Sequence, residues 1–360
     1  MFRVFNFAAG PAMLPETVLL RAQQELLNWQ DSGTSILEIG HRTSVFQDML
    51  AKLEGKLRTL MNIPTNYKVL FLSGGAQGHF SFIPMNLTGK NRDVDYIVSG
   101  IWSERAAKYA KRYANVNIVT TATLTGVPDS STWNLNPNAA YVYYCPNETI
   151  NGLQIHDIPE VGNVPLVGDF TSSILSSHVD VSKFGLIFAS AQKNLGIAGI
   201  TLLIIRDDLL DQAQECTPEI FNYKIQVEQN SLLNTIPTVP VYIMDLMVDW
   251  IVNEQGGLDG ISASNQRKIN KLYACIDNSN GFYRNDIEPK YRSLMNVPFN
   301  LQNNDHLKYF LAEAGQNGLA YLNGHKLVGG ARASVYNAMP EEGVDKLVEF
   351  MQHFAAKYAG

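Results

Sequence analysis

Short apolar runs alternate with amphipathic segments between residues 67 and 206. The runs carry Val, Ile, Leu and Tyr on both faces, as strands buried inside a parallel sheet do. We expect strands at Tyr67–Leu72, Asp95–Val98, Val116–Thr120, Tyr141–Cys145, Pro165–Gly168, Leu186–Ala189 and Ile200–Arg206. Helical periodicity predicts helices at Glu16–Gln30, Ser44–Met61, Gly78–Leu87 and Trp102–Tyr113. The pattern therefore predicts an α/β fold with a mostly parallel sheet flanked by helices.

After Pro240 the pattern changes to longer helices and isolated strands. We expect helices at Val241–Asn253, Leu258–Ile276, Asp305–Ala314 and Glu341–Tyr358, and strands at Leu294–Asn300 and Lys326–Val335. This spacing favours a smaller α+β domain. The chain has 360 residues, more than one core usually holds, so two domains are expected. We predict a large domain at residues 16–260 and a small domain at residues 1–15 and 261–360.

Composition narrows the class of partner. The formal net charge is −6 and no basic run is present, so nucleic acid and anionic membranes are not expected partners. No window approaches about 18 consecutive apolar residues, and the N-terminus lacks a signal-like apolar stretch, so no membrane span or secretion is expected. Cys145, Cys216 and Cys275 are widely spaced, which favours a reducing cytoplasm.

The strongest chemical signal is Asp169 with Lys193, 24 positions later, each at the end of an apolar run. Taken singly, a helix N-cap aspartate and a surface lysine are the ordinary interpretations. Together they suit pyridoxal phosphate, which a lysine carries as a Schiff base while a carboxylate keeps its ring nitrogen protonated. The pair therefore predicts a cofactor site.

A glycine-rich turn, Ser73-Gly74-Gly75-Ala76-Gln77, joins a predicted strand to a predicted helix. Such a turn lets the backbone approach an anion, which the helix N-terminus then stabilises. It matches neither a Walker loop nor a dinucleotide fingerprint, which argues against a dehydrogenase. Its alternative interpretation is a plain tight turn.

Other polar and aromatic residues fall at strand ends. Trp102 would stack on a cofactor ring, or else belong to the core. Asn147 and Thr149 would donate hydrogen bonds to a cofactor hydroxyl or to Asp169, or else form a local turn.

Basic residues supply candidate anion sites. Arg332 lies in an otherwise small and apolar strand, where burial is costly unless an anion or a local acid meets it. The dipeptides His41-Arg42 and His325-Lys326 would be solvated loop charges without further context.

Taken together, these stretches resemble the phosphoserine aminotransferases, a class V branch of the fold-type I pyridoxal phosphate enzymes. The resemblance runs in order along almost the whole chain. The matching pieces are Phe5–Pro15, Gly40–Arg42, Gly74-Gly75, Tyr144–Ile150, Asp169–Ser173, Gln192–Gly196, Asn234-Thr235 and Gly329–Met339.

The resemblance implies a role for each matching position. Lys193 would bind the cofactor covalently, Asp169 would pair with its ring nitrogen, Trp102 would stack on the ring, and Thr149 would lie near its phenolic oxygen. Its phosphate would be held by Ala76, Gln77 and Gln192, with Asn234 and Thr235 of a neighbouring subunit. The substrate would be bound by Ala9, His41, Arg42, His325, Lys326 and Arg332, with Arg332 on the α-carboxylate.

The implied activity is amino transfer from L-glutamate to 3-phosphohydroxypyruvate, by a ping-pong scheme, in a cytoplasmic homodimer with shared active sites. It belongs to serine biosynthesis, and a phosphorylated four-carbon keto acid of pyridoxine biosynthesis is a further expected substrate. Gln77 and Lys326 stand where enterobacterial members have arginine, which bears on phosphate affinity. The alternatives are a class V enzyme of other specificity, such as another aminotransferase or a cysteine desulfurase, and a non-catalytic binding protein. A desulfurase needs a reactive cysteine on a mobile loop, which no cysteine position here suggests.

Overall fold

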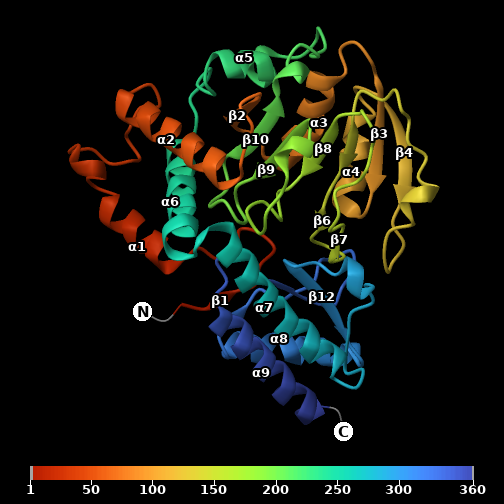
Figure 1. Ribbon diagram of the computed structural model, residues 1–360. Helices are drawn as coiled ribbons and strands as arrows, with labels where there is room; N and C mark the ends of the chain where they lie inside the picture. Colours follow the sequence, from red (N-terminus) through yellow and green to blue (C-terminus); the bar gives the residue numbers. More distant parts are fainter. Residues whose placement is uncertain (1–2, 359–360) are drawn as a thin grey trace.

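The computed structural model describes residues 3–358. Figure 1 shows a large sheet with helices in the upper part of the molecule and a smaller unit, coloured blue, below it. The predicted fold class is confirmed: the chain is α/β, with a large, mostly parallel sheet flanked by helices and a smaller α+β part.

The large sheet has seven strands in the order β2-β10-β9-β8-β5-β3-β4. All neighbours are parallel except β10, which runs antiparallel to both β2 and β9. The bounds are β2 Tyr67–Leu72, β3 Asp93–Val98, β4 Asn115–Thr121, β5 Val142–Tyr144, β8 Leu166–Asp169, β9 Leu186–Ser190 and β10 Thr201–Arg206. Each lies within two residues of the predicted strand, because the burial of both faces produces the apolar runs seen in the sequence.

Helices cover both faces of this sheet. One face packs against α3 (Gly75–Leu87), α4 (Ile101–Ala110) and α5 (Tyr223–Glu228). The other packs against α2 (Ser44–Leu60), α6 (Thr238–Glu254) and the start of α7 (Gly257–Asp277). Outside α6 lies α1 (Glu16–Glu25). A short hairpin of β6 (Asn147–Glu148) and β7 (Leu153–Gln154) follows β5.

The smaller unit is built on an antiparallel sheet, β11-β12-β14. Its strands are β11 Tyr283–Arg284, β12 Asn296–Leu301 and β14 Ala331–Ser334, and its helices are α8 Leu307–Gln316 and α9 Glu341–Tyr358. The N-terminal strand β1 (Phe5–Asn6) pairs in parallel with β13 (Leu319–Ala320). Phe7 packs in the apolar core of this unit.

Helix α7 connects the two cores. Leu258 and Ile261 pack with the large sheet, whereas Ile269 and Leu272 pack in the smaller unit. The division near residue 260 stays a proposal, and its bounds include residues 1–2 and 359–360, which lie outside the described residues. Within residues 3–358, none of the helices is long and apolar enough to cross a membrane.

Two sequence predictions of local structure were wrong. The helix expected over Glu16–Gln30 ends at Glu25, because Trp29 is buried against Tyr242 and the Asn28 side chain accepts a hydrogen bond from the backbone N–H of Gly33. The strand expected from Lys326 begins only at Ala331. Residues 326–328 form a turn, closed by hydrogen bonds from Val328 and Gly329 to the carbonyl of His325.

Candidate active site

A cavity of about 490 Å³ lies beyond the carboxyl ends of the central parallel strands. Open α/β sheets place their ligand sites at this edge. Residues from both parts of the molecule line it. Among the predicted site residues, the lining includes Ala9, Ala76, Gln77, Trp102, Thr149, Asp169, Gln192, Lys193, His325 and Arg332.

Asp169 is the last residue of β8 and is buried. Its carboxylate accepts hydrogen bonds from the backbone N–H of Thr171 at 3.0 Å and from the hydroxyl of Tyr143 at 3.2 Å. Burial raises the pKa of Asp169, and the hydrogen bonds from Thr171 and the charge of Lys193 partly offset this rise. A cationic group in the cavity would favour the ionised carboxylate further.

Lys193 follows the end of β9, and its side chain is buried. Strands β8 and β9 are adjacent and parallel, so Asp169 and Lys193 come to the same edge of the sheet. Within residues 3–358 the Lys193 amine has no hydrogen bond or ion pair, and its only charge–ring contact is the Tyr336 ring, with Nζ 6.0 Å from the centroid. A buried amine without a polar partner is costly, which points to a partner in the cavity.

The glycine-rich turn forms the start of α3. Gly74 has φ +110° and Gly75 has φ +59°, a conformation that side chains disfavour. A Cβ atom on Gly74 would also lie 2.7 Å from the Phe82 ring. The turn therefore leaves the first N–H groups of α3 pointing toward the cavity side, as an anion site requires.

Trp102 lies in the first turn of α4 and donates a hydrogen bond from its indole nitrogen to the Thr149 hydroxyl at 2.9 Å. Together the two residues form one wall of the cavity. Thr149 thus fixes the indole, and its carbonyl oxygen accepts a hydrogen bond from Arg332 Nη1 at 3.0 Å.

The sequence analysis missed Glu148, a fully buried carboxylate. Its oxygens accept hydrogen bonds from the backbone N–H groups of Trp102 at 2.9 Å and Ser103 at 2.8 Å, so it caps α4 from outside the helix. Burial raises its pKa, and the hydrogen bonds from Ser103 and Trp102 oppose the rise. A Cβ atom on Gly100 would lie 2.6 Å from this carboxylate. The only sequence signal was an acid between the polar residues already singled out.

Asn147 does not serve the cavity as expected. Its side-chain NH₂ donates to the Ser172 hydroxyl at 2.8 Å and to Asn296 at 2.9 Å, and its oxygen accepts from Ser293. These bonds tie the large sheet to the smaller unit. The predicted donation to Asp169 or to a cofactor hydroxyl was therefore wrong for Asn147.

Further buried polar contacts hold the Lys193 segment against the smaller unit. The Asn194 side chain accepts from the backbone N–H of Asn337 at 3.1 Å, and the Tyr336 hydroxyl donates to the carbonyl of Ala9 at 3.0 Å. Lys268, fully buried, donates to the carbonyls of Tyr336, Asn337 and Met339. This seam fixes Arg332, a few residues earlier, relative to Lys193.

Arg332 is half-buried in β14, and within residues 3–358 no carboxylate pairs with it. The alternative of a structural ion pair is therefore not seen. Burial lowers the pKa of Arg332, which expresses the cost of keeping this charge away from water. A carboxylate entering the cavity would offset that cost.

His325 lies beside Arg332 at the cavity. Burial, together with the positive charges of Arg332, Lys326 and Arg105, lowers its pKa. Lys326 is exposed and does not line the cavity. Arg105 was not among the predicted site residues.

The remaining predicted residues lie away from this chain's cavity. His41 and Arg42 precede α2, and Asn234 and Thr235 are exposed before α6. A single subunit does not bring them to Lys193.

Comparison with known proteins points in one direction. The aminotransferase class-V family matches residues 4–347. The phosphoserine aminotransferase of Acinetobacter baylyi is 52% identical over 360 residues, covering 99% of both chains. The solved phosphoserine aminotransferase of Bacillus circulans subsp. alkalophilus is 40% identical with a TM-score of 0.96, covering 99% of both chains. A pyridoxal phosphate-bound phosphoserine aminotransferase from Trichomonas vaginalis is also 40% identical, with a TM-score of 0.93, covering 97% of this chain and all of that one.

Proposed function

The chain belongs to the class-V aminotransferase family, and on this premise we propose that it is a pyridoxal phosphate-dependent phosphoserine aminotransferase. It transfers the amino group of L-glutamate to 3-phosphohydroxypyruvate and yields O-phospho-L-serine and 2-oxoglutarate, a step of serine biosynthesis. One observation carries the proposal. The buried Lys193 amine and the half-buried Arg332 guanidinium line one cavity, and neither has an acidic partner within residues 3–358.

The cavity residues fit the cofactor. Lys193 offers a buried amine, Asp169 a buried carboxylate, and Trp102 an aromatic wall fixed by Thr149. Its phosphate would meet the start of α3 near Ala76 and Gln77, with Gln192 across the cavity. When bound there, pyridoxal phosphate supplies a reactive carbonyl group and a ring that accepts electrons.

The protein's own residues then bind, orient and move protons. Arg332 would take the substrate α-carboxylate in a bidentate pair, as guanidinium groups do. That pair would orient the substrate so that the Lys193 amine removes a proton from its Cα and returns one in the reverse direction. Asp169 would keep a proton on the ring nitrogen.

Dual specificity would follow from the cations at the far side of the cavity. L-Glutamate carries a second carboxylate, and 3-phosphohydroxypyruvate carries a phosphate group. Both are anionic at that end, so His325 and its basic neighbours would serve for either. A phosphorylated four-carbon keto acid, as in pyridoxine biosynthesis, has the same two anionic ends.

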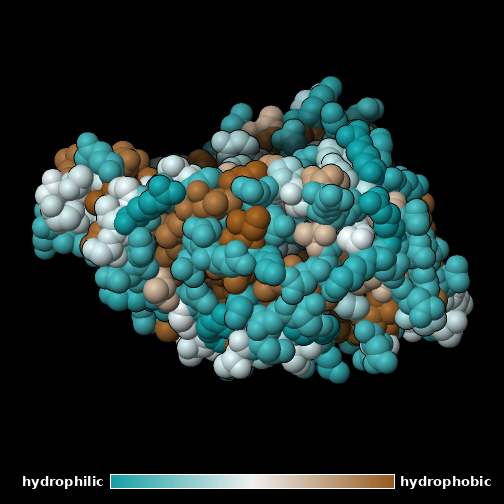
Figure 2. Space-filling view, turned by 90° about the horizontal axis from the view of Figure 1, so that it is seen from above, coloured by the Kyte–Doolittle hydropathy of each residue, from teal (hydrophilic) through white to brown (hydrophobic). Residues whose placement is uncertain are grey.

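The active form is a homodimer in this proposal. His41, Arg42, Asn234 and Thr235 would reach the cavity of the partner subunit, because they lie outside their own. Exposed leucines on and after α1 support a covered face, with Leu27 at 83% and Leu37 at 64% exposure. In Figure 2 apolar atoms gather on the lobe that projects at the left, where Figure 1 places the segment between α1 and α2. The three cysteines are free thiols, which supports action in the cytoplasm.

A coupled assay tests the function. With bound cofactor, the protein should form 2-oxoglutarate from L-glutamate when 3-phosphohydroxypyruvate is the acceptor, and far more slowly with hydroxypyruvate. Turnover with a different acceptor only would indicate a class V aminotransferase of other specificity. Failure to develop the visible absorption of lysine-bound cofactor after adding pyridoxal phosphate would overturn the proposal.

A further inference from the structure

Arg105 lies on α4 one turn after Trp102, and its side chain is half-buried. Its guanidinium carbon is 4.9 Å from the centroid of the Trp102 ring. Within residues 3–358 it has no hydrogen bond and no ion pair. The stack holds the guanidinium group in place while leaving its N–H donors free.

The charge of Arg105 also reaches the cavity. It acts on the His325 imidazole together with the charges of Arg332 and Lys326. The buried acid nearest to this turn of α4 is Glu148, which is already bonded to the backbone of Trp102 and Ser103. Basic groups therefore gather at this end of the cavity without a carboxylate of the protein to pair with them.

We propose that Arg105 binds the distal anionic group of the substrate and selects for a phosphate ester over a neutral group. This inference rests on the proposed function, because it assigns a ligand end within the same site. A substrate with two anionic ends needs two separate sets of donors. Arg332 supplies one set for the α-carboxylate, and Arg105, stacked on the cavity wall formed by Trp102, supplies donors for the other end.

Calorimetry with a substrate-like molecule that cannot react would test the assignment. The holoenzyme is titrated with 3-phosphoglycerate, which carries both anions but no amine, and with glycerate, which lacks the phosphate. The variants are Arg105→Gln, Arg105→Lys and the matched control Lys108→Gln. Lys108 is exposed on the same helix, and its substitution changes the net charge by the same amount.

We expect Arg105→Gln to weaken binding of 3-phosphoglycerate about tenfold and binding of glycerate less than twofold, with the visible band of the bound cofactor unchanged. Arg105→Lys should lose less, and Lys108→Gln should match the wild-type protein. The same order is expected for kcat/KM with O-phospho-L-serine. Arg105→Lys also separates loss of charge from loss of the ring contact.

Two results would overturn the assignment. One is a loss in Arg105→Gln no greater than in Lys108→Gln, and the other is an equal loss for both ligands, which would indicate a structural role. In either case the wild-type protein would still prefer 3-phosphoglycerate and transaminate phosphoserine, so the proposed function would stand. A wild-type protein that shows neither property would overturn both.

Discussion

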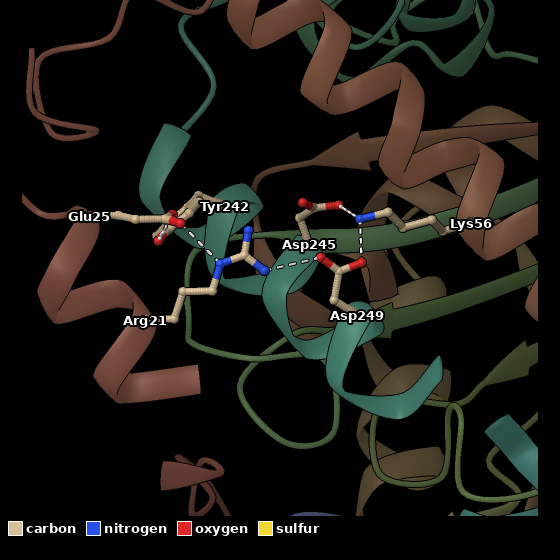
Figure 3. A network of polar contacts seen from close by, with 6 residues as sticks. All are labelled: Arg21, Glu25, Lys56, Tyr242, Asp245 and Asp249. Atoms are coloured by element: carbon tan, nitrogen blue, oxygen red, sulfur yellow. Dashed lines mark hydrogen bonds and ion pairs between the residues drawn. The ribbon is translucent and has the colours of Figure 1, made fainter. Parts of the chain in front are cut away.

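Two regions of this protein arrange their charged side chains in opposite ways. Beside the large sheet, helices α1, α2 and α6 carry a network in which every charge has a partner (Figure 3). Lys56 lies 2.8 Å from Asp245 and 2.5 Å from Asp249, while Arg21 pairs with Glu25 and Asp249. At the cavity, Lys193, Arg105 and Arg332 have no acidic partner within residues 3–358.

The difference separates a structural role from a binding role. Charges that satisfy one another hold helices together and need no ligand. Half-buried cations that lack an acid keep the cost of lost hydration until an anion arrives. Substitutions in the two regions should therefore affect different quantities.

The largest effect is expected from Lys193→Ala. Removal of the amine should lower kcat about 10,000-fold, because the proton transfer at the substrate Cα loses its general base. Steady-state kinetics measures this, and the visible absorption of lysine-bound cofactor should vanish. The melting temperature should not fall, since no protein group loses a partner. A variant that keeps its visible band would place the covalent link on another residue.

Arg332→Ala should lower kcat/KM about 100-fold for amino and keto acids alike, equal to about 2.7 kcal/mol. Every such substrate carries an α-carboxylate, so phosphorylated and non-phosphorylated substrates should lose equally. Arg332→Lys should recover only part of the loss, because an ammonium group cannot make the bidentate pair. A loss confined to phosphorylated substrates would contradict this role.

Lys56→Met transfers the test to the paired region. It leaves Asp245 and Asp249 side by side, which should cost about 2 kcal/mol of unfolding free energy at pH 7, between the values for exposed and buried pairs. The kcat value should not change. Thermal unfolding at equal protein concentration, compared with the wild-type protein, measures the loss.

The pH dependence of this variant has a definite sign. Burial raises the pKa of Asp245, and Lys56 opposes that rise. Without Lys56 the folded protein binds a proton more readily than the unfolded chain, so lowering the pH favours the folded state. The stability loss should therefore shrink between pH 7 and pH 5. A loss that grows on acidification would contradict the like-charge explanation.

The smallest effect is expected from His325→Ala, about tenfold in kcat/KM for phosphorylated substrates and less for L-alanine. Burial and three nearby positive charges lower the pKa of His325, so its contribution is that of a hydrogen-bond donor rather than a full charge. Kinetics with O-phospho-L-serine beside L-alanine checks the difference. Equal losses for both would remove His325 from the distal site.

Much of the fold could be predicted from local pattern. Strand Tyr67–Leu72 and helix Glu341–Tyr358 have the predicted bounds, because burial on both faces and on one face produce distinct periodicities. Prediction failed where a distant contact decides the local structure. The helix from Glu16 stops early because Trp29 packs against Tyr242, more than 200 positions away along the chain.

The candidate site shows the same division. Asp169 and Lys193 could be predicted because each directly follows a buried strand, and strand ends meet at one edge of a parallel sheet. Glu148 and Arg105 could not, since the first caps a helix that begins 47 positions earlier and the second stacks on an indole. Neither contact leaves a pattern in the sequence.

The sequence by itself determined the class of fold, the family and the residues that fit pyridoxal phosphate. Those features depend on periodicity and on residue types at strand ends, which are local properties. Only the tertiary structure decided which charges are paired. Pairing depends on distances between segments far apart in the chain, such as Arg332 and the carbonyl of Thr149 at 3.0 Å. That distinction separates the cations that hold the helices from those left to bind substrate.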